Sequence, residues 1–341
     1  MANRAVYGID MGTSNFKIYD IGSGTVLNEK NIIAIKNKDE IYGFGDYAFD
    51  MYEKAPEEIL VSFPIKNGVI ADLNNMERLF NSFYDKVNKG KNVTGADFII
   101  SVPTDITEVS KRAFFDVIDE SKAKAHKIMM VEKPVADSLG VSIDPNNPKG
   151  NMIVNIGADT TEISVMSMGG IVISRLIPCG GNVFDDSIVS AIRHKHNLVI
   201  GLRSAEKLKI SLANALNENA SAEKLVFGRN IVSGLPVSAK ISGKLVYDAL
   251  YENVSKIVDS IKSILERTPP ELSADIIDTG IYVTGGSGRI KDFDKLINKE
   301  TGLKTIVAQN PEETVIHGLN RLARDEKLKD FLYVPNEKKI D

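Results

Sequence analysis

The chain has 341 residues, of which 43% are hydrophobic and 26% are charged, and its formal net charge is −4. This length is too great for one typical domain, so we expect two domains with large cores. The near balance of charge gives no electrostatic reason to expect nucleic acid or a strongly anionic membrane surface as a partner.

Cysteine and histidine usage excludes further classes of protein. The one cysteine, Cys179, cannot form an internal disulfide, and the four histidines lack the spacing of a metal site. His194 and His196 are close in sequence, but on a helix they would point to different faces. The first ten residues lack a signal-peptide pattern, and no run approaches the roughly 18 apolar residues of a membrane span. We therefore expect a cytoplasmic protein.

The chain contains an internal repeat. Residues 9–20, IDMGTSNFKIYD, align without a gap with residues 154–165, VNIGADTTEISV. Each copy has an apolar strand, a turn of glycine and small polar residues, and an alternating strand, which predicts a β-hairpin. The repeat predicts two related domains, although two unrelated hairpins would give the same local pattern.

Strands followed by helices are expected in both halves. The apolar run at 98–103 precedes a helical stretch at 108–124, and a long amphipathic helix in the second half is closed by Pro269 and Pro270. A buried strand followed by an amphipathic helix is typical of layered α/β domains. The segment 142–151 is rich in Pro, Asn and Gly, and we expect it to connect the domains.

Three glycine-containing segments could bind phosphate or nucleoside groups. Turns that offer backbone N–H groups without bulky side chains form anion-binding concavities, and Gly12-Thr13-Ser14 and Gly157-Ala158-Asp159-Thr160 are such turns. Asp10 could hold a magnesium ion through water, or it could simply initiate the turn. The segment 284–288, TGGSG, follows an expected strand, where a purine ring and ribose could approach the backbone.

The first two of these three segments are the two copies of the repeat. The order of the three segments is similar to that of the sugar kinase, heat-shock chaperone and actin superfamily. Within it the chain resembles the MreB family of bacterial actins almost from end to end. The matching segments include GIDMGTSN, SVPTDITEVSKRA, VEKPVADSLG, NIGADTTEISVMSMGGIVISR, SAEKLKISLANA and TGIYVTGG. The resemblance implies an α/β, actin-like fold of two related domains, each a mixed sheet with helices, and a nucleotide cleft between them.

The resemblance also implies domain boundaries. Domain I would span residues 1–144, with a small inserted subdomain near 32–75 and a C-terminal helix, residues 311–325, packing back on it. Domain II would span residues 145–310, with a small subdomain near 182–250.

The family further implies ATP or ADP with Mg²⁺ as cofactors. Its members form head-to-tail filaments, expected here as paired protofilaments that support cell shape or motility. The Lys- and Asn-rich composition and the absence of Trp suggest a divergent paralogue of the type found in wall-less helical bacteria.

The same resemblance assigns the nucleotide site. Phosphate contacts fall on Gly12, Thr13, Ser14, Asn15, Gly157, Ala158, Asp159, Thr160, Thr161 and Gly181. The adenosine pocket falls on Glu206, Lys209, Gly285, Gly286 and Ser287. Glu206 and Lys209 would share one face of a helix, as a common pocket requires, although an exposed salt bridge would show the same spacing. The resemblance places the magnesium ion near Asp10, which would hold it through water, and Asn155 would contact the waters around the ion rather than the ion itself.

At the catalytic positions the chain departs from the family pattern. The family normally has a Glu immediately before the Pro of the domain-connecting motif, where it positions the attacking water. Here VEKP places Lys133 at that position and Glu132 one residue earlier, and Thr160 is the remaining catalytic candidate. In the second turn Asn155 replaces an Asp, and Ala158 and Asp159 replace two glycines.

These departures predict weak or absent ATP hydrolysis. Lys133 and Asp159 could form an ion pair in the space that the attacking water needs, or Lys133 could neutralise the γ-phosphate directly. Either arrangement keeps nucleotide binding and removes the general base. A shift of one residue would instead return Glu132 to the catalytic position.

Two other functions occur in the superfamily. A small-molecule kinase would need an acidic base, for which Asp72 is the candidate, and a chaperone-like ATPase is disfavoured because no peptide-binding domain is present. Direct membrane insertion is not expected, since the N-terminus is too short for an amphipathic helix and residues 86–97 carry two large apolar side chains. The tail, residues 326–341, could contact the inner face of the cell membrane or a membrane protein, or pack on its own domain.

Overall fold

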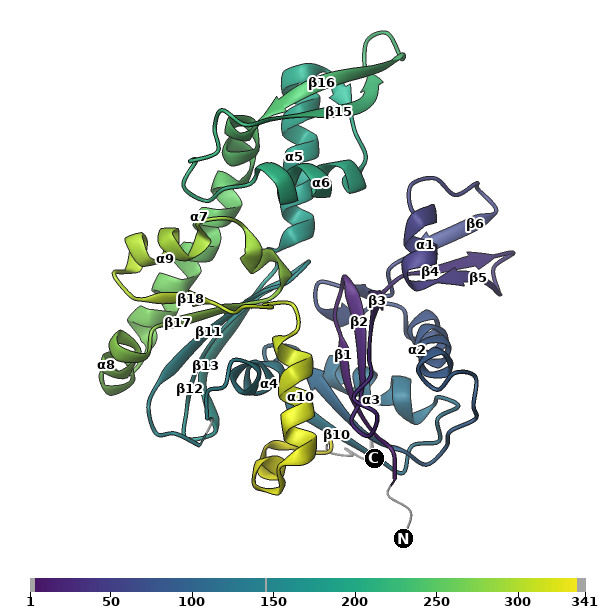
Figure 1. The fold of residues 1–341 in the computed structure, drawn as a ribbon, viewed down its shortest axis with the longest axis vertical. Coiled ribbons are helices and arrows are strands. Elements are labelled where there is room, and N and C mark those ends of the chain that lie inside the picture. Colours follow the sequence, from purple (N-terminus) through teal and green to yellow (C-terminus); the bar gives the residue numbers. More distant parts are fainter. Residues whose placement is uncertain (1–3, 145, 336–341) are drawn as a thin grey trace. The chain divides into compact units, whose positions relative to one another are not determined.

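The computed structural model describes residues 4–144 and 146–335. The chain divides into two compact units, unit 1 (residues 1–147 and 313–341) and unit 2 (residues 148–312). Each unit contains a main sheet with helices against it and a separate small sheet (Figure 1). No helix in the described part of the chain is long and apolar enough to cross a membrane.

Unit 1 is built on a five-stranded mixed sheet with the order β10-β9-β1-β2-β3. Strands β1, β2 and β3 form antiparallel hairpins, whereas β9 runs parallel to β1 and to β10. The strands are β1 Val6–Met11, β2 Asn15–Asp20, β3 Val26–Lys30, β9 Asp97–Val102 and β10 Lys127–Glu132. The helices that accompany this sheet are α2 Leu73–Val87, α3 Glu108–Asp119, α4 Lys133–Gly140, α10 Thr314–Arg324 and the short η2 Glu326–Phe331.

The remaining part of unit 1 is a small sheet with the order β5-β4-β6, which carries one short helix, and a two-stranded hairpin. These elements are β4 Ile33–Lys36, β5 Glu40–Phe44, α1 Gly45–Met51, β6 Ile59–Ser62, β7 Ile65–Lys66 and β8 Val69–Ile70.

Unit 2 repeats the arrangement of the main sheet, with the order β13-β12-β11-β17-β18. Its strands are β11 Asn151–Ile156, β12 Thr161–Ser167, β13 Gly170–Ile177, β17 Ile281–Thr284 and β18 Thr305–Val307. Its helices are α5 Gly181–His196, α6 Leu202–Leu212, α7 Gly243–Arg267, α8 Pro270–Thr279, η1 Gly286–Arg289 and α9 Phe293–Thr301. A small sheet of β14 Leu198–Val199, β15 Glu223–Asn230 and β16 Pro236–Ser242 completes the unit.

The first hairpins of the two units have the same register. Ile9 pairs with Ile18 in unit 1, and Val154 pairs with Ile163 in unit 2. These are the residues that the gap-free sequence alignment placed over one another. The sequence repeat therefore corresponds to equivalent positions in two similarly ordered sheets, and the predicted α/β fold with mixed sheets is confirmed.

Each unit has its own apolar core. In unit 1 an aromatic cluster joins the sheet to α2, where Phe80 stacks on Tyr84 and contacts Phe98 edge-on. In unit 2 the long helix α7 buries Ile257, Ile261 and Ile264, whose spacing of four and three residues defines one helix face. Burial of these faces is the main stabilising contribution in each unit.

Helices α4 and α10 of unit 1 pack closely because two glycines face the neighbouring backbone. A Cβ atom on Gly140 would lie 2.0 Å from the carbonyl oxygen of Thr314, and one on Gly318 would lie 1.8 Å from that of Ala136. At the same contact the Thr314 hydroxyl donates to the Asp137 carboxylate at 2.5 Å. This packing positions α4, whose first residue is Lys133.

We expect Gly318→Ala to destabilise the protein measurably. The added methyl group overlaps the backbone of α4, so the helices must separate, at a cost of about 2 kcal/mol even after the better helix propensity of alanine. Gly170→Ala is the matched control, because a Cβ there meets only the Ser167 carbonyl oxygen at 3.7 Å. Thermal unfolding of both variants measures the difference, and equal midpoints would contradict the close packing.

Candidate functional site

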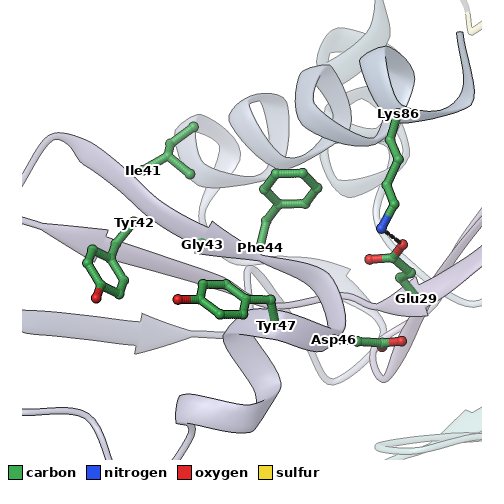
Figure 2. Close-up of a pocket in the computed structure, with 8 residues that line it drawn as sticks. All are labelled: Glu29, Ile41, Tyr42, Gly43, Phe44, Asp46, Tyr47 and Lys86. Carbon is green, nitrogen blue, oxygen red and sulfur yellow. Dashed lines mark hydrogen bonds and ion pairs between the residues drawn. The ribbon is translucent and has the colours of Figure 1, made fainter. Parts of the chain in front are cut away.

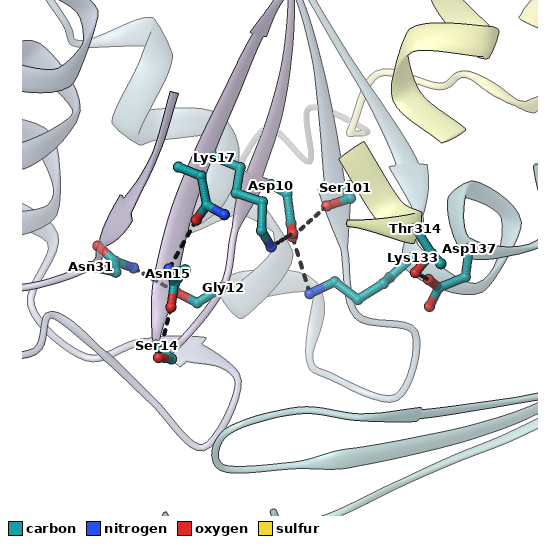
Figure 3. Close-up of polar contacts among 11 residues, drawn as sticks. Asp10, Gly12, Ser14, Asn15, Lys17, Asn31, Ser101, Lys133, Asp137 and Thr314 are labelled. Carbon is teal, nitrogen blue, oxygen red and sulfur yellow. Dashed lines mark hydrogen bonds and ion pairs between the residues drawn. The ribbon is translucent and has the colours of Figure 1, made fainter. Parts of the chain in front are cut away.

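The turn between β1 and β2 is closed by a backbone hydrogen bond and supported by the Asn31 side chain. The Gly12 N–H donates to the Asn15 carbonyl oxygen at 3.0 Å, and the Asn31 side chain donates to the Gly12 carbonyl oxygen at 2.7 Å (Figure 3). A Cβ atom on Gly12 would lie 2.8 Å from the same Asn15 oxygen. Any larger residue at Gly12 would therefore deform the turn.

Side chains from β2 and β3 reinforce this turn. The Ser14 hydroxyl donates to Asn15 Oδ1 at 2.8 Å, and Lys30 Nζ donates to Ser14 Oγ at 3.1 Å. The Asn31 N–H also donates to the Ser14 carbonyl oxygen at 2.8 Å. The turn thus combines small residues with a nearby ammonium group, which suits an anionic ligand.

The carboxylate of Asp10 lies directly before this turn and is 3% exposed. Lys17 Nζ donates to Oδ2 at 3.0 Å. The Ser101 hydroxyl donates to Oδ1 at 3.2 Å, and Lys133 Nζ forms an ion pair with the same oxygen at 3.5 Å. Figure 3 shows both ammonium groups converging on this carboxylate. Burial raises the pKa of Asp10, but the two lysines and Ser101 outweigh it and lower the pKa to about 2.

The donor set at Asp10 is a poor fit for the magnesium ion expected from the sequence. A magnesium ion binds oxygen ligands and keeps several bound waters. These waters donate hydrogen bonds, so nearby carboxylate oxygens must be free to accept them. Here each carboxylate oxygen of Asp10 already faces an ammonium group. Among residues 4–144 and 146–335, no group of three or more His, Cys, Asp or Glu could hold a metal ion. Asn155 lies on β11 of unit 2, paired with Glu162 and Thr284.

Glu132 and Lys133 have different partners, although they are adjacent. Glu132 ends β10 and accepts hydrogen bonds from Lys111 Nζ at 3.0 Å and from the Tyr333 hydroxyl at 3.2 Å. Burial raises the pKa of Glu132, and the Lys111 hydrogen bond opposes that shift only in part. Within unit 1, Lys133 is therefore the residue beside Asp10, whereas Glu132 faces α3 and the C-terminal segment.

The turn of unit 2 repeats the backbone geometry of the first. The Gly157 N–H donates to the Thr160 carbonyl oxygen at 2.8 Å, as Gly12 does to Asn15. Thr161 Oγ1 donates to the Cys179 carbonyl oxygen at 2.7 Å, and Asp159 Oδ1 accepts from the Asn182 side chain at 2.7 Å. The carboxylate of Asp159 is thus held by the first turn of α5.

Further predicted residues of unit 2 lie against this turn. Ser287 Oγ donates to the Gly157 carbonyl oxygen at 2.8 Å, and Lys209 Nζ donates to the Gly181 carbonyl oxygen at 2.8 Å. Gly285 has a φ of 80°, and a Cβ there would lie 2.4 Å from the Ile156 carbonyl oxygen, so only glycine fits. Gly286 begins η1, and Glu206 lies on α6 with Lys209.

The structure also identifies polar residues that the sequence analysis did not include. Lys17 lies opposite Asp10 in the β1–β2 register, and that alternation could have identified it. No comparable sequence pattern pointed to Asn31 or Asp185. Lys209 Nζ donates to Asp185 Oδ2 at 2.8 Å, and burial raises the pKa of Asp185 to about 6 although Lys209 opposes this.

Two other features of unit 1 lie apart from these residues. A cavity of about 320 Å³ is lined by the β5–α1 segment and by the Glu29–Lys86 ion pair (Figure 2), and it contains none of the predicted site residues. Asp72, the candidate base of a kinase, caps α2 by accepting from the Asn75 N–H at 3.0 Å.

Comparison with known proteins gives a consistent result. The profile of the MreB/Mbl protein family matches residues 4–330. The cell shape-determining protein Mbl of Bacillus subtilis (strain 168) is 38% identical over 312 residues, which cover 91% of this chain and 93% of Mbl.

Two crystal structures of MreB5 of Spiroplasma citri are also similar. The form bound to AMPPNP is 33% identical with a TM-score of 0.91, and the match covers 97% of this chain and 98% of the other. The form bound to ADP is 34% identical with a TM-score of 0.89, covering 94% and 97%. The chain therefore belongs to the MreB/Mbl family of actin-like, cell shape-determining proteins.

Proposed function

We propose that this protein binds ATP or ADP and assembles into head-to-tail filaments that support cell shape or motility. The observation that carries the proposal is the pair of glycine turns with matching backbone geometry, one at Gly12 and one at Gly157. It is supported by the similarity to MreB5 of Spiroplasma citri, which was crystallised with AMPPNP and with ADP.

In this proposal each unit supplies part of the nucleotide site, and the two units correspond to the two actin-like domains. The phosphates would contact Gly12, Thr13, Ser14, Asn15, Gly157, Ala158, Asp159, Thr160, Thr161 and Gly181. The adenosine would contact Glu206, Lys209, Gly285, Gly286 and Ser287. Close approach to the backbone at Gly12 and Gly285 supports these roles, because neither position accepts a larger residue without distortion.

We further propose that ATP hydrolysis is weak. Lys133 stands at the position where the family has its water-activating Glu, and it lies beside Asp10 in unit 1. The Oε1 atom of Glu132 accepts hydrogen bonds from Lys111 and Tyr333, on the side of α3 and the C-terminal segment and not beside Asp10. A protonated lysine cannot accept a proton from water, so the step lacks its general base.

Self-assembly is supported by an apolar surface on the β15–β16 hairpin of unit 2. Phe227 is 71% exposed and Val232 in the turn is 84% exposed, with Leu225 and Leu235 also exposed. Exposed apolar patches of this kind can mark protein–protein interaction sites. The occupant that we propose is a second copy of this chain, because a heterologous contact that does not close a ring produces an open filament.

We expect the protein to pellet at micromolar concentration when nucleotide is added, and to form filaments visible by electron microscopy. Phe227→Ser should raise the concentration needed for pelleting about tenfold, since it removes an apolar contact. Val109→Ser is the control, because Val109 is 81% exposed on α3 of unit 1 and is not part of the hairpin. Protein that remains monomeric across salt and nucleotide conditions would disprove the filament proposal.

Contact with the inner face of the cell membrane is a further part of the proposal. The described part of the tail makes contacts within unit 1, where Tyr333 forms a backbone bridge with Met130 and Leu328 is buried. Residues 336–341, which complete the predicted tail, lie outside the described residues. The Tyr333 bridge supports the alternative in which the described part of the tail packs on its own domain.

A further inference from the structure

Asp10 of unit 1 is one buried carboxylate shared by two ammonium groups. Lys17, whose side chain is 9% exposed, and Lys133, whose side chain is 17% exposed, approach its two oxygens at 3.0 Å and 3.5 Å (Figure 3). Lys30 places a third ammonium group on the Ser14 hydroxyl in the adjacent turn. Among these four side chains, the three ammonium groups outnumber the one carboxylate.

We propose that Lys17 and Lys133 take the place of a divalent cation, so that the protein binds free nucleoside di- or triphosphate without magnesium. This inference rests on the proposed nucleotide site and concerns only its charge balance. Ammonium groups make charge-assisted hydrogen bonds to phosphate oxygens and so supply the attraction that a metal ion would otherwise provide.

The position of Lys17 makes displacement by a metal ion unfavourable. Cross-strand pairing in the hairpin sets Lys17 opposite Asp10, and both side chains are buried. A cation at Asp10 would have to separate this pair and leave the ammonium group of Lys17 buried without its carboxylate. It would also face repulsion from Lys133 on the other oxygen.

The test is a calorimetric titration of the full chain with AMPPNP, once in excess EDTA and once in millimolar magnesium chloride. We expect binding in EDTA to be at least as tight as binding in magnesium, because the ammonium groups supply attraction to phosphate oxygens and disfavour a cation at Asp10. The wild-type comparison needs no variant and so does not depend on how any variant folds.

A variant pair then tests the role of Lys133. Lys133→Gln should weaken AMPPNP binding in EDTA about tenfold or more, and magnesium should restore part of the loss. Lys127→Gln is the matched control, since it removes the same charge from an exposed position on β10. It should leave the affinity for AMPPNP unchanged both in EDTA and in magnesium. Thermal unfolding without nucleotide verifies that both variants fold.

Each outcome is decisive. Binding that occurs only with magnesium overturns the inference and leaves the proposed nucleotide site intact. No binding in either buffer overturns the nucleotide site and the inference with it. Binding in EDTA that Lys133→Gln does not change shows that this lysine does not take the place of the cation.

Discussion

Replacing Gly12 with valine should raise the dissociation constant for nucleotide by more than about 100-fold, equivalent to about 2.7 kcal/mol. The Cβ atom alone would lie 2.8 Å from the Asn15 carbonyl oxygen, which accepts the Gly12 N–H across the turn. The two methyl groups of valine would add further crowding where the proposal places a phosphate. Calorimetric titration with AMPPNP measures the loss.

Gly22→Val is the matched control for this experiment. Gly22 lies in the next turn of the same sheet, where a Cβ atom would meet only Asp20 Oδ1 at 3.4 Å. The control should bind nucleotide as the unmodified chain does, and thermal unfolding should show that both variants fold. If folded Gly12→Val keeps its affinity, the turn of unit 1 is not part of the nucleotide site.

The hairpins could be predicted because their signals are local. Alternation of apolar residues sets the two strands, because side chains alternate with a period of two, and small residues permit the turn between them. The gap-free alignment places Ile9 over Val154 and Ile18 over Ile163, and the strand pairing joins the same residues within each hairpin. Family membership followed from the same segments, and it is confirmed by the match over residues 4–330.

The contacts at Asp10 could not be predicted in the same way. The choice between Glu132 and Lys133 depends on where β10 ends and α4 begins, and a difference of one residue exchanges the side chain beside Asp10. The partners of Glu132 come from α3 and from Tyr333 near the C-terminus, which no local pattern connects. The predicted pairing of Lys133 with Asp159 joins residues of different units and stays a hypothesis.

The triple change Lys133→Glu, Asn155→Asp, Asp159→Gly should raise the rate of phosphate release about 100-fold over the unmodified chain. Lys133→Glu restores the group that accepts the proton of the attacking water. Asn155→Asp restores the second carboxylate that the family resemblance gives to this site. Asp159→Gly removes the carboxylate that Asn182 now holds beside the second turn.

Lys133→Glu alone should not restore hydrolysis. If Lys133 pairs with Asp159 as the sequence predicts, the new carboxylate would face the carboxylate of Asp159, and two carboxylates at close range repel or share a proton. The triple variant removes this repulsion because it replaces Asp159 with glycine. The gain of the triple variant should therefore exceed the summed gains of the single changes, as expected for residues that act as one unit. A phosphate-release assay on the unmodified chain, Lys133→Glu and the triple variant measures this directly. Rapid turnover by the unmodified chain would mean that Glu132 or another group already serves as the base, and the proposed role of Lys133 would then be wrong.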